Sequence, residues 1–520
     1  MTKSPPSFDY IVVGGGTAGL AVASRLSEDE AVRVLVIEAG GDHGSDPLVS
    51  TPGALVGQFG NPKYDWNFRS VPQEALNGRS VNQARGRGLG GCSSLNFMMW
   101  LHPSRASLDA WAKLGNPGWA YDDLAPYFKK VCTIHPPSEA ATVMAALGAP
   151  TTSAAILRVA PAPRLRTSAT ELTADPRTGK AIGAFQNPAS IDPKDHTRSS
   201  AAKAYFGPQV LQRPNLTVMT DAVVKRIIFE KDAADCSLLA KGVVVLQSSG
   251  GDKEDEEEEV TISVESEVIL AAGALQSPQI LELSGIGDKD LLEKHGIEVL
   301  VDNPGLRGRR WRPVGRRAAG PRGPGRARGP LPHDQRGRAL GQSNISTAYM
   351  PLVSEQGGLM SAAEKKALLD AHLASEKEEE EGEGEEYQVL RSFIEPQDEP
   401  TAQYLLFPGQ ITTDQHPDSA ASLLIPRAPQ DFATVVTCLN HPASRGSVHI
   451  ASPDVRVRPR FDPKYMSHPL DLEVLARHVQ FVEKIVATEP LRSSFKGEGA
   501  GGPGCRRDWW AIRSSRPRRS

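Results

Sequence analysis

The fold is decided near the start of the chain by the stretch Asp9-Tyr10-Ile11-Val12-Val13-Gly14-Gly15-Gly16-Thr17-Ala18-Gly19-Leu20. An apolar run typical of a strand leads into glycines with the spacing Gly-x-Gly-x-x-Gly, after which a helix is expected. A second apolar run, residues 34–37, ends at the acid Glu38, which lies nineteen residues past Gly19. A strand, a glycine turn, a helix, a strand and an acid in this order predict a dinucleotide-binding β-α-β unit.

The residues of this unit have distinct expected roles. Gly14 makes the tight turn, Gly16 lets main-chain N–H groups approach a pyrophosphate, and Gly19 lets the helix lie close to the strand. The positive end of the helix faces the phosphates, and Glu38 accepts hydrogen bonds from the ribose of the adenosine. The residues of this unit expected to contact the dinucleotide are Gly14, Gly16, Thr17, Ala18, Gly19, Glu38 and Ala39.

Composition limits the class of protein. A chain of 520 residues is expected to form two or three domains. Its net charge of −3 gives no reason to expect a nucleic-acid partner, and it has no apolar run of about 18 residues, the length that predicts a membrane span. Its five cysteines lack metal-binding spacing, so we expect neither a metal site nor a disulfide framework. Because the start of the chain lacks the apolar core of a signal peptide, a cytoplasmic location is expected.

Two segments, residues 306–340 and 496–520, differ in composition from the rest of the chain. The first holds eleven Arg, seven Gly and five Pro, and neither a helix nor a strand period runs through it. A basic tail that binds nucleic acid is one interpretation of such sequence. We favour the hypothesis that both segments are GC-rich coding sequence read in the wrong frame, which sequencing of the transcript would test.

Two later stretches carry glycine-rich motifs. They are residues 86–96 (GRGLGGCSSLN) and residues 273–287 (GALQSPQILELSGIG). They resemble the first and second signatures of the glucose–methanol–choline (GMC) family of flavin oxidoreductases, and the second matches at every signature position. The similarity to family sequences covers residues 8–305 and 430–490.

The resemblance implies FAD as the cofactor. An isoalloxazine ring needs main chain close by, which favours small residues in the first signature. Some relatives attach the flavin covalently through a histidine where this chain has Leu95, so the resemblance implies FAD bound without a covalent link. The flavin contacts implied by the resemblance are Gly90, Gly91, Cys92, Asn96, Phe97 and Met99, with the main chain of Val224 at the adenine.

The resemblance also implies an α/β fold, with a Rossmann-like FAD-binding domain and a substrate domain that carries an antiparallel sheet and helices. The expected division is a FAD-binding domain from residues 1–135 and 191–305, a substrate domain from 136–190 and 341–440, the start of the family's C-terminal part at 441–495, and the anomalous segments 306–340 and 496–520.

The implied reaction is the oxidation of an alcohol. In the family, a histidine takes the hydroxyl proton while the substrate carbon passes hydride to flavin N5, and the electrons then go to oxygen or another acceptor. This chain lacks the family's His-Pro…Gly-Thr-Cys pattern, and its family-like sequence is expected to stop near Leu491. We therefore expect the chain to be inactive, and no catalytic residue is assigned.

None of the twelve histidines matches a catalytic position of the family. His102 follows the first signature and is expected to be structural, although it could lie near the flavin ring. His441 belongs to strand-like sequence, and His449 and His468 are expected at the surface.

Three hypotheses about function stay open. The chain is a GMC enzyme whose sequence is damaged in two places, a flavin-binding pseudoenzyme or partner protein without turnover, or a nicotinamide-dependent Rossmann protein. The two signatures argue against the third hypothesis.

Overall fold

The structure is a computed structural model. It describes residues 7–131, 133, 182–186, 189–231, 237–248, 257–303, 316–321, 346–355, 357–373, 383–407, 411, 419–424 and 432–488. The anomalous tail 496–520 and most of the anomalous segment 306–340 lie outside these residues.

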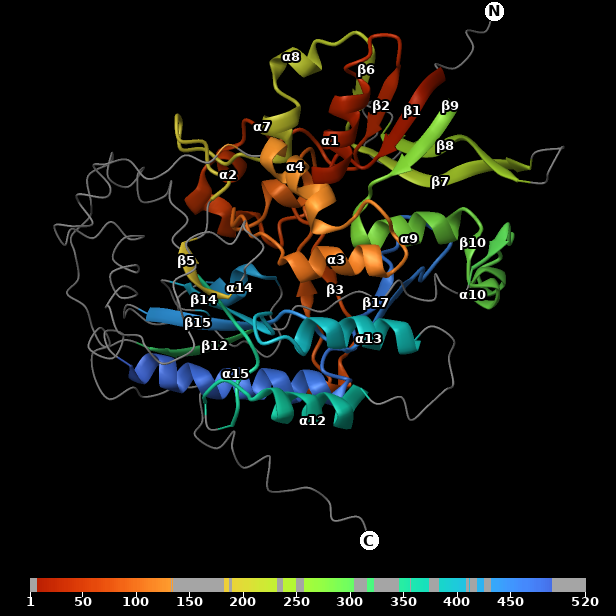
Figure 1. Cartoon of the computed structure of the whole chain (residues 1–520). Helices are drawn as coiled ribbons and strands as arrows, with labels where there is room; N and C mark the ends of the chain where they lie inside the picture. Colours follow the sequence, from red (N-terminus) through yellow and green to blue (C-terminus); the bar gives the residue numbers. More distant parts are fainter. Residues whose placement is uncertain are drawn as a thin grey trace, which may run out of the picture.

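The first of two large sheets is built on the predicted β-α-β unit (Figure 1). Its order is β6 (Leu216–Met219), β2 (Val34–Ile37), β1 (Ser7–Val13), β9 (Glu257–Leu270), β8 (Leu238–Ser248) and β7 (Ala222–Lys231). The first four strands run parallel, and the last two are added antiparallel. Helix α1 (Thr17–Leu26) follows β1 directly, as the glycine spacing predicts.

The parallel strands are buried on both faces, which explains their unbroken apolar sequence. Ile11 and Leu35 lie in one core cluster, whereas Val12 and Val36 lie in the cluster on the opposite side of the sheet. Register pairs Val12 with Val36, so each face receives side chains from both strands.

The second sheet is entirely antiparallel. Its order is β12 (Arg316–Pro321), β15 (Phe432–Leu439), β14 (Ala402–Phe407), β13 (Ser346–Met350) and β5 (Gly183–Gln186). Helix α15 (Pro469–Ala487) packs against this sheet, and α12 (Ala362–Leu373) and α13 (Glu383–Ile394) lie beside it (Figure 1). The predicted α/β class, with a Rossmann-like part and an antiparallel sheet with helices, is confirmed.

Strand β12 differs from the expectation for residues 306–340. No strand period is visible there, yet Arg316–Pro321 pairs with β15. Main-chain hydrogen bonds do not depend on how apolar the side chains are, and an edge strand tolerates proline, so β12 does not need an alternating apolar pattern.

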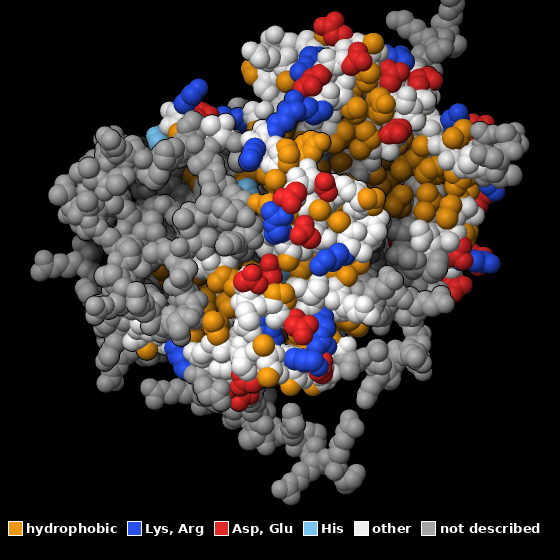
Figure 2. Space-filling view, in the orientation of Figure 1, with side chains coloured by type: hydrophobic (Ala, Val, Ile, Leu, Met, Phe, Trp, Pro, Cys, Tyr) orange, Lys and Arg blue, Asp and Glu red, His pale blue; other side chains and the backbone are white. Residues whose placement is uncertain are grey.

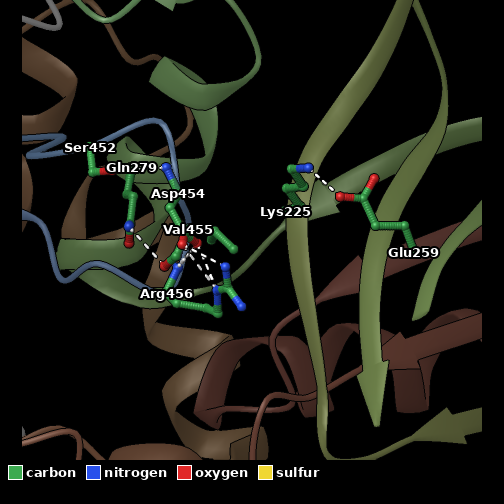
Figure 3. A network of polar contacts seen from close by, with 7 residues as sticks. All are labelled: Lys225, Glu259, Gln279, Ser452, Asp454, Val455 and Arg456. Carbon is green, nitrogen blue, oxygen red and sulfur yellow. Dashed lines mark hydrogen bonds and ion pairs between the residues drawn. The ribbon is translucent and has the colours of Figure 1, made fainter. Parts of the chain in front are cut away.

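The segment after the second sheet returns to the first sheet. It contains β16 (Ser447–His449) and β17 (Arg460–Asp462), which lie near α9 (Gly273–Leu283), the helix of the second signature. The side-chain amide of Gln279 on α9 donates to the carbonyl oxygens of Val455 and Val457 at 3.2 and 2.9 Å. Figure 3 shows the contact between Gln279 and Val455, together with the exposed ion pair between Lys225 on β7 and Glu259 on β9, the strands on either side of β8.

Shorter elements connect these parts. They are α2 (Pro47–Ser50), η1 (Pro52–Gln58), β3 (Phe68–Arg69), η2 (Glu74–Leu76), β4 (Asn82–Gln83), η3 (Gly91–Ser94), α3 (Arg105–Lys113), α4 (Tyr121–Val131), α7 (Ala201–Tyr205), α8 (Pro208–Leu211), β10 (Ile286–Gly287), α10 (Lys289–Lys294), β11 (Val301–Asp302) and α14 (Ala421–Leu424). Within the described ranges, none of the helices has the length and apolar character needed to cross a membrane. Charged side chains of both signs intermingle on the face shown in Figure 2.

Candidate cofactor-binding site

The three signature glycines have different surroundings. Gly14 has φ +103°, and a Cβ there would lie 2.6 Å from the carbonyl oxygen of Ala271. A Cβ on Gly19 would lie 2.0 Å from the carbonyl oxygen of Gly14, so any side chain would push α1 away from the turn. Gly16 is different, because the nearest atom to its Cβ would be Gly91 Cα at 3.9 Å. Gly14 and Gly19 are therefore needed for the fold, whereas Gly16 leaves open space beside it.

The open space lies at the amino end of α1. Among the described residues no side chain caps this helix, its first turn has no acidic residue, and Thr17 and Ala18 are exposed there. The first N–H groups of a helix have no partner within the helix, and the helix dipole makes this end positive. An uncapped positive helix end beside Gly16 is suited to a phosphate group.

Glu38 lies at the end of β2 and is buried. Its carboxylate accepts from the main-chain N–H groups of Gly15 at 2.8 Å, Gly40 at 2.9 Å and Gly88 at 2.9 Å. Burial raises the pKa of the Glu38 carboxyl, and the three N–H donors oppose that shift. Sequence reasoning expected Glu38 only at the ribose, and it missed this role of joining three loops.

Glu38 still has capacity for a ligand. A carboxylate offers about four lone-pair sites, and three donors are named above. Among the described residues, Oε2 accepts a hydrogen bond only from Gly15, so it has a site left for a ribose hydroxyl. The neighbouring Ala39 is half-buried, and its carbonyl oxygen accepts from Arg87 Nη2 at 3.5 Å.

The first-signature loop, residues 86–96, lies directly against the glycine turn, residues 14–16. The N–H of Gly90 donates to the carbonyl oxygen of Gly15 at 2.8 Å, and a Cβ on Gly91 would lie 2.8 Å from Gly16 Cα. Both Gly90 and Gly91 have positive φ, of +91° and +51°. Close main-chain contact therefore brings together two motifs that residues 20–85 separate in the sequence, because no side chain stands between them.

Beyond Gly91 the loop presents side chains outward. Cys92 and Asn96 are exposed, and Phe97 and Met99 are half-buried. Phe97 stacks on Phe59 with ring centroids 5.7 Å apart. Cys92 and Asn96 are thus accessible to a bound molecule, and Phe97 and Met99 are partly so.

Val224 is placed differently from the loop residues. It lies on β7, with its side chain buried in the core cluster of the first sheet. Because the side chain is buried, the main chain is the part left for a ligand, and its contact with the adenine stays a prediction.

Arg198 is a residue that sequence reasoning missed. It is 2% exposed and donates from Nε to the carbonyl oxygen of Val49 at 3.0 Å. Its Nη1 donates to the carbonyl oxygens of Ser93 at 3.2 Å and Asn96 at 2.7 Å, and to Asn96 Oδ1 at 3.0 Å. No local sequence signal marks it, because all these partners lie about 100 or more residues away.

The four histidines considered in the sequence make structural contacts. His102 is buried and accepts from Trp100 Nε1 at 2.9 Å. His449 was expected at the surface, but its side chain is only 26% exposed and its Nδ1 lies 2.8 Å from the buried carboxylate of Glu282. His468 is also half-buried, because it caps the amino end of α15. His441 stacks on Phe393 with ring centroids 4.8 Å apart.

The residues present fit a long dinucleotide. Space for a pyrophosphate at Gly16, an acceptor at Glu38 and an open loop from Gly90 to Asn96 lie on contiguous main chain. A flavin adenine dinucleotide has a group for each of these features: a ribose for the carboxylate, a pyrophosphate for the helix end and an isoalloxazine ring for the loop.

Comparisons with known proteins identify this pattern. The chain matches the model of GMC oxidoreductase N-terminal domains over residues 8–318 and that of C-terminal domains over residues 442–515. The expectation that family-like sequence stops near Leu491 is therefore wrong. The added match extends into residues that carry no strong motif, which is why reading by motif missed it.

Individual proteins agree with the family match. The dehydrogenase citC of Monascus ruber is 32% identical over 534 residues, which cover 94% of this chain and 82% of citC. A FAD-dependent oxidoreductase from Chaetomium thermophilum has the same fold, with a TM-score of 0.75 and 24% identity over 98% of this chain and 87% of that one. Pyridoxine 4-oxidase from Mesorbium loti has a TM-score of 0.69 and 24% identity over 97% and 85%.

Proposed function

Because the chain belongs to the GMC family of FAD-dependent oxidoreductases, we propose that it oxidises the CH–OH group of an alcohol. In this proposal the substrate carbon gives hydride to flavin N5, and oxygen or another acceptor reoxidises the flavin. One observation carries the proposal. The uncapped end of α1, the Glu38 carboxylate and the first-signature loop form one continuous surface that suits FAD.

The FAD is proposed to bind without a covalent link, along the contacts expected from the sequence. Leu95 occupies the position where some relatives carry a linking histidine, and its side chain is 3% exposed and packed in a core cluster. A buried aliphatic side chain cannot form a bond to the ring. The proposed contacts are Gly14, Gly16, Thr17, Ala18, Gly19, Glu38, Ala39, Gly90, Gly91, Cys92, Asn96, Phe97, Met99 and Val224.

The substrate is proposed to be a bulky or aromatic alcohol. Phe97 and Met99 make the accessible part of the loop apolar, and the similar pyridoxine 4-oxidase is named for a ring-bearing substrate. Packing in the core is an equally good explanation of these two side chains, because Phe97 stacks on Phe59.

A second candidate function is a flavin-binding protein without turnover. The full sequence lacks the family's His-Pro…Gly-Thr-Cys pattern, and the four histidines considered above, His102, His441, His449 and His468, make structural contacts. This candidate shares the FAD site and differs only in the chemistry after binding.

One experiment separates these functions. Purified protein is loaded with FAD, and its flavin absorbance is followed anaerobically while benzylic and aliphatic alcohols are added. Alcohol oxidation predicts bleaching of the flavin band, whereas the second candidate predicts yellow protein that no alcohol bleaches. Protein that retains no FAD after desalting would refute both. Precipitation with acid should release all the flavin into solution if the link is not covalent.

A further inference from the structure

Asn96 is held in one orientation by two donors. Its Oδ1 accepts from Arg198 Nη1 at 3.0 Å and from the main-chain N–H of Met98 at 2.9 Å. Both lone pairs of that oxygen are then used. Because an amide has its oxygen and its NH2 group on opposite sides, Nδ2 is turned away from Arg198. Asn96 is exposed, and in the described part of the chain its Nδ2 has no partner. The loop thus presents a hydrogen-bond donor.

Arg198 is itself held in place by hydrogen bonds to residues 49 and 50. Its Nε donates to the carbonyl oxygen of Val49, and its main-chain N–H donates to that of Ser50 at 2.8 Å. Ser93 is tied to the same segment, because its Oγ accepts from the N–H of Ala201 at 2.8 Å. The first-signature loop therefore rests on a rigid support, with the guanidinium at its centre.

The positive charge of Arg198 has no matching negative charge. Its acceptors are neutral carbonyl oxygens, and no carboxylate among the described residues is paired with it. Nη2 is buried and also lacks a partner there. Burial lowers the pKa of the guanidinium to about 10, so it stays charged at neutral pH. A buried charge of this kind is costly unless something else compensates it.

We propose that Arg198 is a positioning residue for the flavin, which turns the donor end of Asn96 toward the ring and places an uncompensated positive charge behind the loop. This inference rests on the proposal above that the flavin lies along residues 90–99. Reduced flavin gains electron density, and a fixed donor and a nearby cation both favour it. Arg198 therefore raises the midpoint potential of bound FAD and strengthens its binding.

Four variants test this inference. Arg198→Met removes the charge and the hydrogen-bond donors of Arg198, whereas Arg198→Lys keeps the charge. Asn96→Asp keeps the oxygen that faces Arg198 but replaces the outward donor with an acceptor. Asn96→Ala removes the amide. Flavin fluorescence gives the Kd for FAD, dye equilibration gives the midpoint potential, and thermal unfolding shows that each variant is folded.

The expected results differ between the variants. Arg198→Met weakens FAD binding about tenfold and makes the midpoint potential more negative, and Arg198→Lys gives a smaller potential shift. Asn96→Asp also lowers the potential. In the Asn96→Ala background, Arg198→Met changes the potential less than in the wild type, because Arg198 then has no amide to orient. A purely structural role would leave the change the same in both backgrounds.

The results that overturn this inference differ from those that overturn the proposed FAD site. An unchanged potential in folded Arg198→Met, or an equal shift in both backgrounds, overturns it. If Arg198→Met does not fold, an unchanged potential in both Arg198→Lys and Asn96→Asp overturns it equally. Wild-type protein that binds no FAD overturns the proposed site as well, whereas yellow wild-type protein with insensitive variants overturns this inference alone.

Discussion

A methyl group at Gly16 should separate cofactor binding from folding. Gly16 has φ −79° and ψ −167°, which alanine adopts without strain, and the nearest atom to the added Cβ is Gly91 Cα at 3.9 Å. Surface substitutions without a clash change stability by about 0.5 kcal/mol or less. The apo protein with Gly16→Ala should therefore unfold at nearly the wild-type denaturant midpoint.

The same methyl group projects into the space proposed for the pyrophosphate. It would keep a phosphate oxygen from reaching the N–H groups of the first turn of α1. A hydrogen bond to a charged group contributes about 1.5–3 kcal/mol. Loss of one such bond weakens FAD binding about tenfold to a hundredfold. Titration of apo protein with FAD, followed by flavin fluorescence, measures this change directly.

Gly14→Ala is the matched control. A Cβ there lies 2.6 Å from Ala271 O, and φ of +103° is unfavourable for alanine. Backbone strain costs about 1–3 kcal/mol, and the clash adds to it, so this variant should unfold at lower denaturant concentration even without FAD. Gly16→Ala with wild-type affinity for FAD would refute the phosphate site. Equal destabilisation of the two apo variants would refute the geometry of the turn.

Three further predictions concern other parts of the molecule. Glu282→Ala leaves the buried N–H of Ile450 unpaired and removes the partner of the half-buried His449, and should cost about 2–4 kcal/mol in urea unfolding, whereas Glu259→Gln in an exposed ion pair should cost less than about 1 kcal/mol. Burial lowers the pKa of His478 to about 3, so its contribution to stability is present above about pH 6.5 and is lost as the pH falls. His478→Gln should therefore lose less stability than the wild type as the pH falls from 6.5 to 5, with a difference in slope that grows from about 0.7 kcal/mol per pH unit at pH 6.5 toward about 1.4 near pH 5; parallel curves would contradict this. FAD should protect exposed Cys92 from alkylation, measured by peptide mass spectrometry, while buried Cys438 stays unlabelled with or without FAD; labelling of Cys92 unchanged by FAD would place the flavin elsewhere.

The parts of the fold that sequence predicts best are those encoded locally. The β1-α1-β2 unit follows from an apolar run, a glycine spacing and a second apolar run within 31 residues, Ser7 to Ile37. Each of these signals acts through neighbours in sequence, so no distant contact is needed to interpret them. The glycine turn and the helix start therefore lie where the spacing places them.

The parts that sequence did not predict depend on distant partners. Arg198 reaches Asn96 across 102 residues, and His449 reaches Glu282 across 167. Neither side chain belongs to a periodic pattern, so a single sequence gives no reason to pair them. Strand β12 also depends on a distant partner, because it pairs with β15. Long-range pairing, rather than local propensity, decides these features.

Binding of FAD and turnover of an alcohol depend on different parts of the chain. The proposed FAD surface is built from residues 14–99 with Arg198 and Val224, all ahead of the family's C-terminal part. That later part contacts the cofactor domain through α9, where Glu282 holds Ile450 and His449. Cofactor binding therefore does not require a catalytic base, and retained FAD alone is no evidence of turnover. Only bleaching of the flavin by an alcohol distinguishes an oxidoreductase from a protein that keeps the cofactor and has lost the reaction.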